Sequence, residues 1–223
     1  MPQDIAAIDP AWAWSSFEPS DEQPWNRRLA AHLCRRAGFG ATSEELDRLI
    51  ERSPAEVAHA FVKNAKDAST TDPENDSLAT AMLATGNARN LAAWWLHRIL
   101  NSPWEGDDAS SSSPLLEKLT LFWHGHFATG ADKVDDAEMM FSQNRLLRRH
   151  ALGDFAAMTQ EISRDPAMLI YLDSTTNRKA HPNENYAREI MELFCLGEGN
   201  YTERDIQELA RCFTGWEVRR KKF

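Results

Sequence analysis

Apolar residues recur along the chain at the three- and four-residue spacing of helices, and no run alternates as a strand would. The clearest case runs from Leu115 to Phe127, where leucines and aromatic residues return every turn. Start and stop signals bound these runs: Thr42 and Ser53 are each followed three residues later by glutamate, the capping-box pattern, and Gly38 ends an earlier run. The pattern predicts an all-α protein, an irregular bundle of about eight to ten helices with no significant sheet.

The same signals divide the chain into successive helices. Between residues 77 and 101 we expect one long helix, or two helices joined near Gly86. A helix that begins at Pro54 follows the Ser53 cap. The other expected helices span residues 26–37, 42–52, 114–130, 136–151, 154–163, 166–172, 184–196 and 203–213.

Prolines, tryptophans and polar runs mark the segments outside the helices. Residues 1–25 contain Trp12, Trp14 and Trp25, and they predict an extended Trp/Pro-rich arm that its aromatic rings hold against the domain. Polar linkers are expected near 67–76 and 105–113, and the four consecutive serines of the second predict a disordered tip. We therefore expect one helical domain over 26–216 and a basic tail over 217–223.

The charge balance narrows the possible partners. A net charge of -9 argues against nucleic acid, because phosphate neutralisation needs a basic surface. The basic clusters at 145–150 and 219–222 are expected to be solvated helix ends. No apolar run approaches the roughly 18 residues of a membrane-spanning helix. The N-terminus lacks the basic and apolar regions of a signal peptide, so the sequence as written predicts a soluble, cytoplasmic protein.

The three cysteines give no sign of a redox or metal motif. Cys34, Cys195 and Cys212 lie far apart in the sequence, with no Cys-x-x-Cys pair. Each lies among apolar residues of an expected helix, and free cysteine behaves as a small hydrophobe. We expect three buried, reduced thiols.

Acidic, amide and arginine side chains concentrate on the helix expected over 184–196. Glu184, Arg188 and Glu192 follow one another at four-residue spacing and would present a carboxylate, a guanidinium and a second carboxylate in line. Glu189 is a candidate general base beside them. A ladder of ion pairs on a solvated face explains the same stripe. The apolar face of this helix is expected to carry Tyr186, Ala187, Ile190, Leu193 and Phe194.

Two histidines near the end of the helix expected over 114–130 are candidate metal ligands. His124 and His126 point about 200° apart on an ideal helix, so both reach one metal only if the helix unwinds at Gly125. Glu117 shares a face with His124, and this pair could hold a metal or orient the imidazole. Ordinary packing and capping of helix carbonyls explain the histidines as well.

A third polar segment runs from Asp165 to Asp173. Asp165 followed by Pro166 is typical of an N-cap and a first helical residue. Asp173 closes the apolar stretch, where the helix dipole disfavours a carboxylate unless something pairs it. Arg178 or a metal is the candidate partner.

Five segments, taken in order, resemble the motifs of a large bacterial family known as domain of unknown function 1800. They are AHLCRRAGFG at 31–40, LFWHGHF at 121–127, DPAMLIYLD at 165–173, NENYARE at 183–189 and FTGW at 213–216. The resemblance implies a mainly helical protein whose relatives are often exported, and it implies no particular reaction. Members usually continue past the Thr-Gly-Trp motif, so we expect a chain truncated there. The residues at motif positions that the resemblance groups into one site are His124, His126, Glu184, Asn185, Arg188, Glu189 and Trp216.

Two classes of function follow from these candidates. In the first, the protein is a metal-assisted hydrolase or related enzyme that binds a divalent metal through His124, His126 and Glu192. Its catalytic residues would be Glu184, Arg188 and Glu189. In the second, it is a non-catalytic helical binding or assembly module whose polar helix and Trp-rich arm dock a partner. An inactive fragment of a longer protein, dependent on a protein partner, is a variant of the second class.

Overall fold

The protein is described by a computed structural model that covers residues 11, 14–71, 73, 76–104 and 112–218. Within these residues the chain forms helices joined by short loops, and the only strand-like pairing is one isolated bridge between Arg178 and His181. In the described part of the chain, ten helices are seven residues or longer when α12 and its π-helical continuation are counted as one. The all-α prediction is confirmed.

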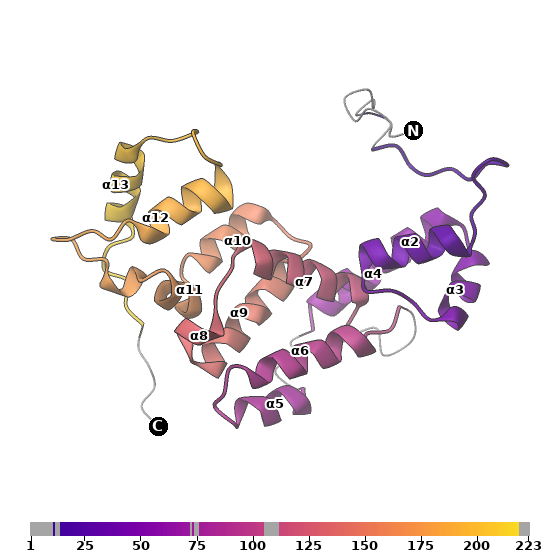
Figure 1. Cartoon of the computed structure of the whole chain (residues 1–223), viewed down its shortest axis with the longest axis horizontal. Helices are drawn as coiled ribbons and strands as arrows, with labels where there is room; N and C mark the ends of the chain where they lie inside the picture. The colour runs from indigo at the N-terminus through magenta and orange to yellow at the C-terminus, as the bar shows by residue number, and fades with distance from the viewer. Residues whose placement is uncertain (1–10, 12–13, 72, 74–75, 105–111, 219–223) are drawn as a thin grey trace.

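The first half of the chain forms one end and one side of the molecule (Figure 1). Helices α2, α3 and α4 lie together at that end, and the pair α5 and α6 packs beside the centre. The loop after α6 contacts the α2–α4 group, because Trp104 in that loop packs with residues of α2 and α4. The bounds are Arg27–Ala37 for α2, Ser43–Ile50 for α3, Pro54–Ser69 for α4, Ser77–Leu83 for α5 and Asn90–Asn101 for α6.

The second half supplies the centre and the opposite end. Helices α7 and α9 cross the middle of the molecule, and α12 and α13 lie at the end far from α2 (Figure 1). Helix α7 contacts α4, α6 and α9, so it holds the two halves together. The bounds are Pro114–His126 for α7, Ala131–Val134 for α8, Ala137–His150 for α9, Phe155–Ile162 for α10, Pro166–Tyr171 for α11, Ser174–Thr176 for the 3-10 helix η4, Asn185–Glu189 for α12, Ile190–Cys195 for the π-helix η5 and Glu203–Cys212 for α13.

The expected caps account for most helix starts. Both capping boxes form, with Thr42 and Ser53 each accepting from the backbone N–H of the glutamate three residues on. Asp165 caps α11, and Pro166 is its first residue. Between 77 and 101 the chain makes two helices, because Gly86 adopts a φ of 66° in the turn that separates them. The caps therefore act where local sequence predicts them.

Three segments expected to lie outside the helices have described residues that contact the core. The 67–76 linker is partly helical, because α4 continues to Ser69, and Asp76 joins a buried network. Most of the 105–113 linker lies outside the described residues, but Ser112 at its end donates to Glu117 at 3.0 Å. In the arm, Trp25 packs on the core, whereas Trp14 is 90 % exposed. Of the arm tryptophans that the structure describes, Trp25 contacts the core and Trp14 does not, and Trp12 lies outside the described residues.

Two predictions about polar and thiol groups are wrong. Arg148, expected in a solvated basic cluster, is only 1 % exposed, because its position on α9 faces the centre. Cys34 is buried as expected, but Cys195 and Cys212 are exposed at the ends of their helices. Residue type and neighbours along the chain did not reveal which helix face each residue occupies.

The centre of the fold contains a buried ion pair between Glu117 of α7 and Arg148 of α9. The carboxylate accepts two parallel hydrogen bonds from the guanidinium, at 2.6 and 2.8 Å, and its side chain is fully buried. Trp95 and Ser112 donate to the same carboxylate at 3.0 Å each. Arg148 and Arg98 hold the pKa of Glu117 below its usual value against the opposing effect of burial. The carboxylate is therefore ionised in the fold.

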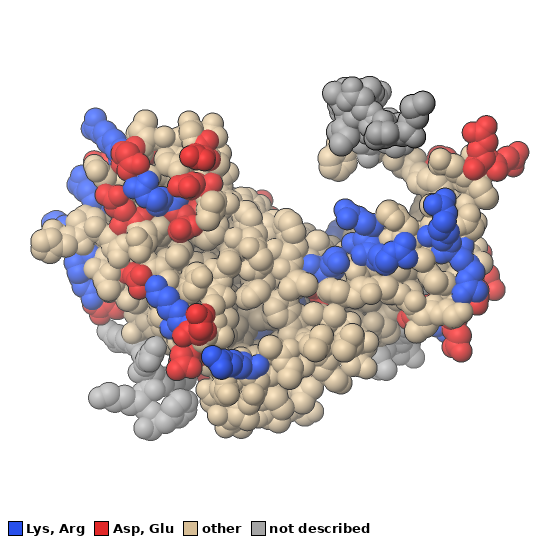
Figure 2. Space-filling model, in the orientation of Figure 1, with Lys and Arg blue, Asp and Glu red and all other residues tan. Residues whose placement is uncertain are grey.

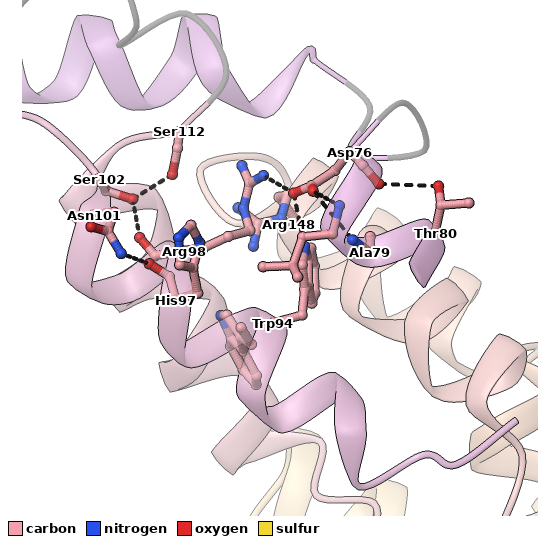
Figure 3. Close-up of polar contacts among 12 residues, drawn as sticks. Asp76, Ala79, Thr80, Trp94, His97, Arg98, Asn101, Ser102, Ser112 and Arg148 are labelled. Carbon is pink, nitrogen blue, oxygen red and sulfur yellow. Dashed lines mark hydrogen bonds and ion pairs between the residues drawn. The ribbon is translucent and has the colours of Figure 1, made fainter. Parts of the chain in front are cut away.

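A second carboxylate extends this network to the start of α5. Asp76 caps α5 through one oxygen and accepts from Trp94 at 2.8 Å and from Arg98 at 3.0 Å through the other (Figure 3). Arg98 also reaches Glu117 at 3.4 Å, so it bridges the two carboxylates. We call Asp76, Arg98, Glu117 and Arg148 the central ion cluster.

Breaking the buried pair should destabilise the protein strongly. Glu117→Gln removes the charge but keeps the shape, and it leaves Arg148 buried without a counter-ion. We expect the free energy of unfolding, measured in urea, to fall by about 3–5 kcal/mol. The matched control is Asp47→Asn, which breaks the exposed pair with Arg27 and should cost about 1 kcal/mol or less. Equal losses in the two variants would contradict a central role for the buried pair.

Candidate functional site

A pocket of about 250 Å³ opens between α6, α7 and α9, next to the central ion cluster. Its walls are mostly apolar, with a small number of polar side chains among them, which is the usual composition of small-molecule sites. The residues that matter for its chemistry are Trp94, Trp95, His124, Thr129, Phe141 and Asn144. We call it the α6–α7–α9 pocket.

The central ion cluster holds the two tryptophans of the pocket in place. Consecutive residues on a helix diverge by about 100°, so the neighbouring rings leave α6 in different directions. Trp94 donates its indole N–H to Asp76 at 2.8 Å, and Trp95 donates to Glu117 at 3.0 Å. A buried indole needs such a partner, and here each partner also fixes the orientation of a pocket wall.

His124 lines the pocket as a neutral imidazole. Its ring stands edge-on to Trp95, with 5.3 Å between the ring centroids. Burial lowers its pKa, so the neutral form dominates at pH 7. Among the described residues it has no hydrogen-bond partner, because Glu117, its expected partner, is bound by Arg148 and Trp95. The imidazole is therefore available to donate to or accept from a ligand.

Asn144 contributes an unsatisfied amide to the same pocket. Its side chain is 8 % exposed, and its buried Oδ1 has no hydrogen-bond partner in the described part of the chain. An unsatisfied buried polar group costs about 1–3 kcal/mol, so a structure keeps one only for a reason. The sequence analysis missed this residue. The available signal was an amide three residues after Phe141 and three before Leu147, which places it on the face of α9 that carries these apolar residues.

His126 faces a different part of the molecule. Its Nε2 lies 3.0 Å from the carbonyl oxygen of Phe194, so this nitrogen donates to the π-helix η5. Its ring packs among the aromatic rings of Trp123, Phe127 and Phe155. The histidine therefore links the end of α7 to η5.

The helix expected over 184–196 changes register after Glu189. Within η5 the amide of Leu196 donates to the carbonyl of Met191 at 2.9 Å, which is the five-residue spacing of a π-helix. Each residue of the π-helix therefore rotates the chain about the helix axis by a smaller angle than a residue of an α-helix does. Tyr186 and Phe194 are buried as expected, but Leu193, expected on the apolar face, is 62 % exposed. The wider register explains that error.

The polar stripe of this helix forms surface ion pairs. Arg188 binds Glu184 at 3.3 Å and Glu203 of α13 at 2.9 Å. Glu192 accepts from the hydroxyl of Tyr201 at 2.9 Å. Burial and the nearby Glu192 raise the pKa of Glu189. The structure thus brings Glu184 and Arg188 together, and it places Glu189 beside Glu192.

The predicted metal ligands do not converge. His124 lies in the α6–α7–α9 pocket, His126 bonds to Phe194, and Glu192 bonds to Tyr201. Throughout the described residues, no group of three or more His, Cys, Asp or Glu side chains is placed to hold a metal ion. The described residues thus do not bring His124, His126 and Glu192 together as one metal site, and the catalytic roles of Glu184, Arg188 and Glu189 stay predictions.

A comparison with known protein families identifies the family of this chain. The sequence profile of a family described as "Protein of unknown function (DUF1800)" matches residues 32–223. The chain belongs to this family. The match spans α2 to α13 and confirms the resemblance that the five motifs predicted. No curated protein and no solved structure matches the chain.

Two asparagines at or near the DUF1800 motifs order the loop before α12. Asn183 accepts from the amide of Asn185 at 2.9 Å and donates to Thr176, also at 2.9 Å. Asn177 is buried, accepts from the amide of Asn183 and donates to the carbonyl of Ala210. These contacts fasten the NENYARE segment to α13, so its first asparagine positions the loop.

The acid at the end of α11 is paired differently from the expectation. Asp173 binds Lys133 of α8 at 2.9 Å, whereas Arg178 pairs with Glu217 at 3.3 Å. Asp173 adopts a φ of 57°, which turns the chain away from α11 and carries its carboxylate toward α8.

None of the helices in the described ranges is both long and apolar enough to cross a membrane.

Asp165 should make the stability of this DUF1800 chain depend on pH. Burial raises its pKa to about 6, although Met168 and Gln143 donate to it and oppose the shift. A raised carboxyl pKa favours the neutral form in the fold, so this group stabilises most below pH 4 and loses that contribution as pH rises to about 6.

The test compares the wild type with Asp165→Asn, which keeps a capping side chain but does not titrate. In urea unfolding between pH 4 and 7, the stability of the wild type relative to the variant should fall by up to about 3 kcal/mol. A difference that stays constant over this range would show that the carboxyl pKa is not raised.

Proposed function

We propose that the protein is a helical binding module for a small ligand, and that the α6–α7–α9 pocket is its binding site. The observation that carries the proposal is the unsatisfied amide of Asn144 in an aromatic-walled pocket. Apolar walls with a few convergent polar groups are the usual form of a ligand site. Asn144 and the neutral His124 are the polar groups that would orient a ligand there.

The rigidity of the walls supports this proposal. Trp94 and Trp95 are both anchored through their indole N–H groups to carboxylates of the central ion cluster. A site whose walls are already ordered spends less conformational entropy on binding than a mobile one. Figure 3 shows how Trp94 and Arg98 converge on Asp76.

The metal-assisted hydrolase has less support. The lining of the α6–α7–α9 pocket includes no carboxylate, whereas such an enzyme needs ligands and a base around one point. On the other candidate surface, Arg188 is engaged by Glu184 and Glu203. The proposal therefore follows the second class of function, but places the binding site in this pocket and not on the polar face of α12.

Filling the mouth of the pocket should abolish binding. Indole serves as a general aromatic probe, observed by saturation-transfer NMR. Ala92 lines the pocket and is exposed, so Ala92→Trp should obstruct the mouth without disturbing the core. We expect the wild type to bind indole and Ala92→Trp to lose most of the signal.

The matched control is Ala93→Trp, because Ala93 is exposed on the same helix but does not line the pocket. It should bind indole as the wild type does, and thermal melting should show both variants folded. Absence of indole binding in the wild type, or equal binding in Ala92→Trp, would refute the pocket as a ligand site.

A further inference from the structure

We infer that the ligand of the α6–α7–α9 pocket is a planar heteroaromatic ring with an adjacent hydrogen-bond donor and acceptor, joined to a hydroxyl-rich group, as in a purine nucleoside. The inference rests on the proposed function and specifies its ligand. Three independent features carry it: the Asn144 amide, the aromatic walls and a polar chamber at the mouth.

The amide of Asn144 selects the edge of the ring. An asparagine side chain presents one acceptor and one donor group side by side, and here the buried Oδ1 of Asn144 has no partner among the described residues. The complementary edge has a donor beside an acceptor, as the 6-amino group and N7 of adenine do. A half-turn about χ2 exchanges the two ends of the amide, so either end can face the pocket.

The walls select a flat, aromatic ligand. Trp95 is partly exposed to the pocket, and Phe141 packs edge-on against Trp94 at 5.2 Å between ring centroids. Aromatic side chains bind bases of any sequence because every base offers a π-face. His124, neutral and without a hydrogen-bond partner among the described residues, adds a further polar contact at the ring edge.

The mouth of the pocket continues into a polar chamber of about 430 Å³. The two spaces share Ala88, Arg89 and Ala131, and the chamber adds Asp132 and Asp135. Figure 2 shows acidic and basic side chains gathered where α8 lies beside the loop between α5 and α6. Taken together, the two volumes reach the size range of small-molecule sites, about 300–1,000 Å³.

The charges of this chamber suit hydroxyl groups better than a phosphate. The carboxylates of Asp132 and Asp135 can accept hydrogen bonds from sugar hydroxyls, and a phosphate would meet both negative charges. The guanidinium of Arg89 has no side-chain partner in the described ranges and can donate to the same hydroxyls. A nucleoside therefore fits the combined site better than a nucleotide.

The probes are adenosine, purine riboside (which lacks the 6-amino group), adenosine 5′-monophosphate and indole, measured by calorimetric titration of the whole chain. We expect adenosine to bind about tenfold or more tightly than purine riboside, because one good amide pair discriminates by about 1–3 kcal/mol. Adenosine should also bind more tightly than its monophosphate, and more tightly than indole.

Two variants locate the contacts. Asn144→Leu should weaken adenosine below the affinity that purine riboside has for the wild type, because the riboside keeps its N7 contact, and it should leave indole unchanged. Asp132→Asn, at an exposed position, should weaken adenosine but not indole, which has no sugar. Together they separate recognition of the ring from recognition of the sugar.

The outcomes distinguish this inference from the proposed function. If indole binds but adenosine gains nothing over purine riboside, the ligand assignment is overturned and the pocket remains a binding site. If the monophosphate binds more tightly than adenosine, the nucleoside assignment is likewise overturned. If neither indole nor adenosine binds, both the pocket and its ligand are refuted.

Discussion

The pairing of Glu117 with Arg148 is the interaction on which the rest of the fold depends. Removing both charges from water costs several kcal/mol for each ion, and hydrogen bonds to the charged groups offset that cost. Besides Arg148, the partners of the Glu117 carboxylate come from separate parts of the chain: Trp95 and Arg98 from α6, and Ser112 from the end of the loop before α7. A helix or loop out of place would leave a buried charge unsatisfied, so the ion cluster specifies one arrangement of α6, α7 and α9.

The same cluster lies beside the α6–α7–α9 pocket and orients two of its walls. The polar face of α12, the strongest chemical signal in the sequence, is occupied with ion pairs between Arg188, Glu184 and Glu203. The pocket beside Trp95, by contrast, combines a neutral His124 with an amide that has no partner among the described residues. Groups that satisfy one another stabilise structure, whereas groups left open can serve a ligand.

Features that depend on neighbouring residues could be predicted from the sequence, whereas features that depend on packing between distant residues could not. Caps such as Thr42 with Glu45 depend on residues three apart, so the helices they start could be predicted. Arg148 lies beside Arg149 in the sequence, yet one is buried and the other exposed, because only tertiary packing decides which face of α9 is covered. The π-helical register after Glu189 has no such local signal, and it moved Leu193 to the surface.

The two adjacent tryptophans of α6 have a consequence for how the protein can vary. Their indole N–H groups are fixed to Asp76 and Glu117 in diverging directions, so a slide or a rotation of α6 breaks both bonds at once. The helix is therefore locked in register, and the depth of the pocket is fixed with it. Changes to the pocket that keep this register would fall on lining residues that take no part in the two bonds, such as Arg89 and Ala92 at the rim and Asn144 on α9.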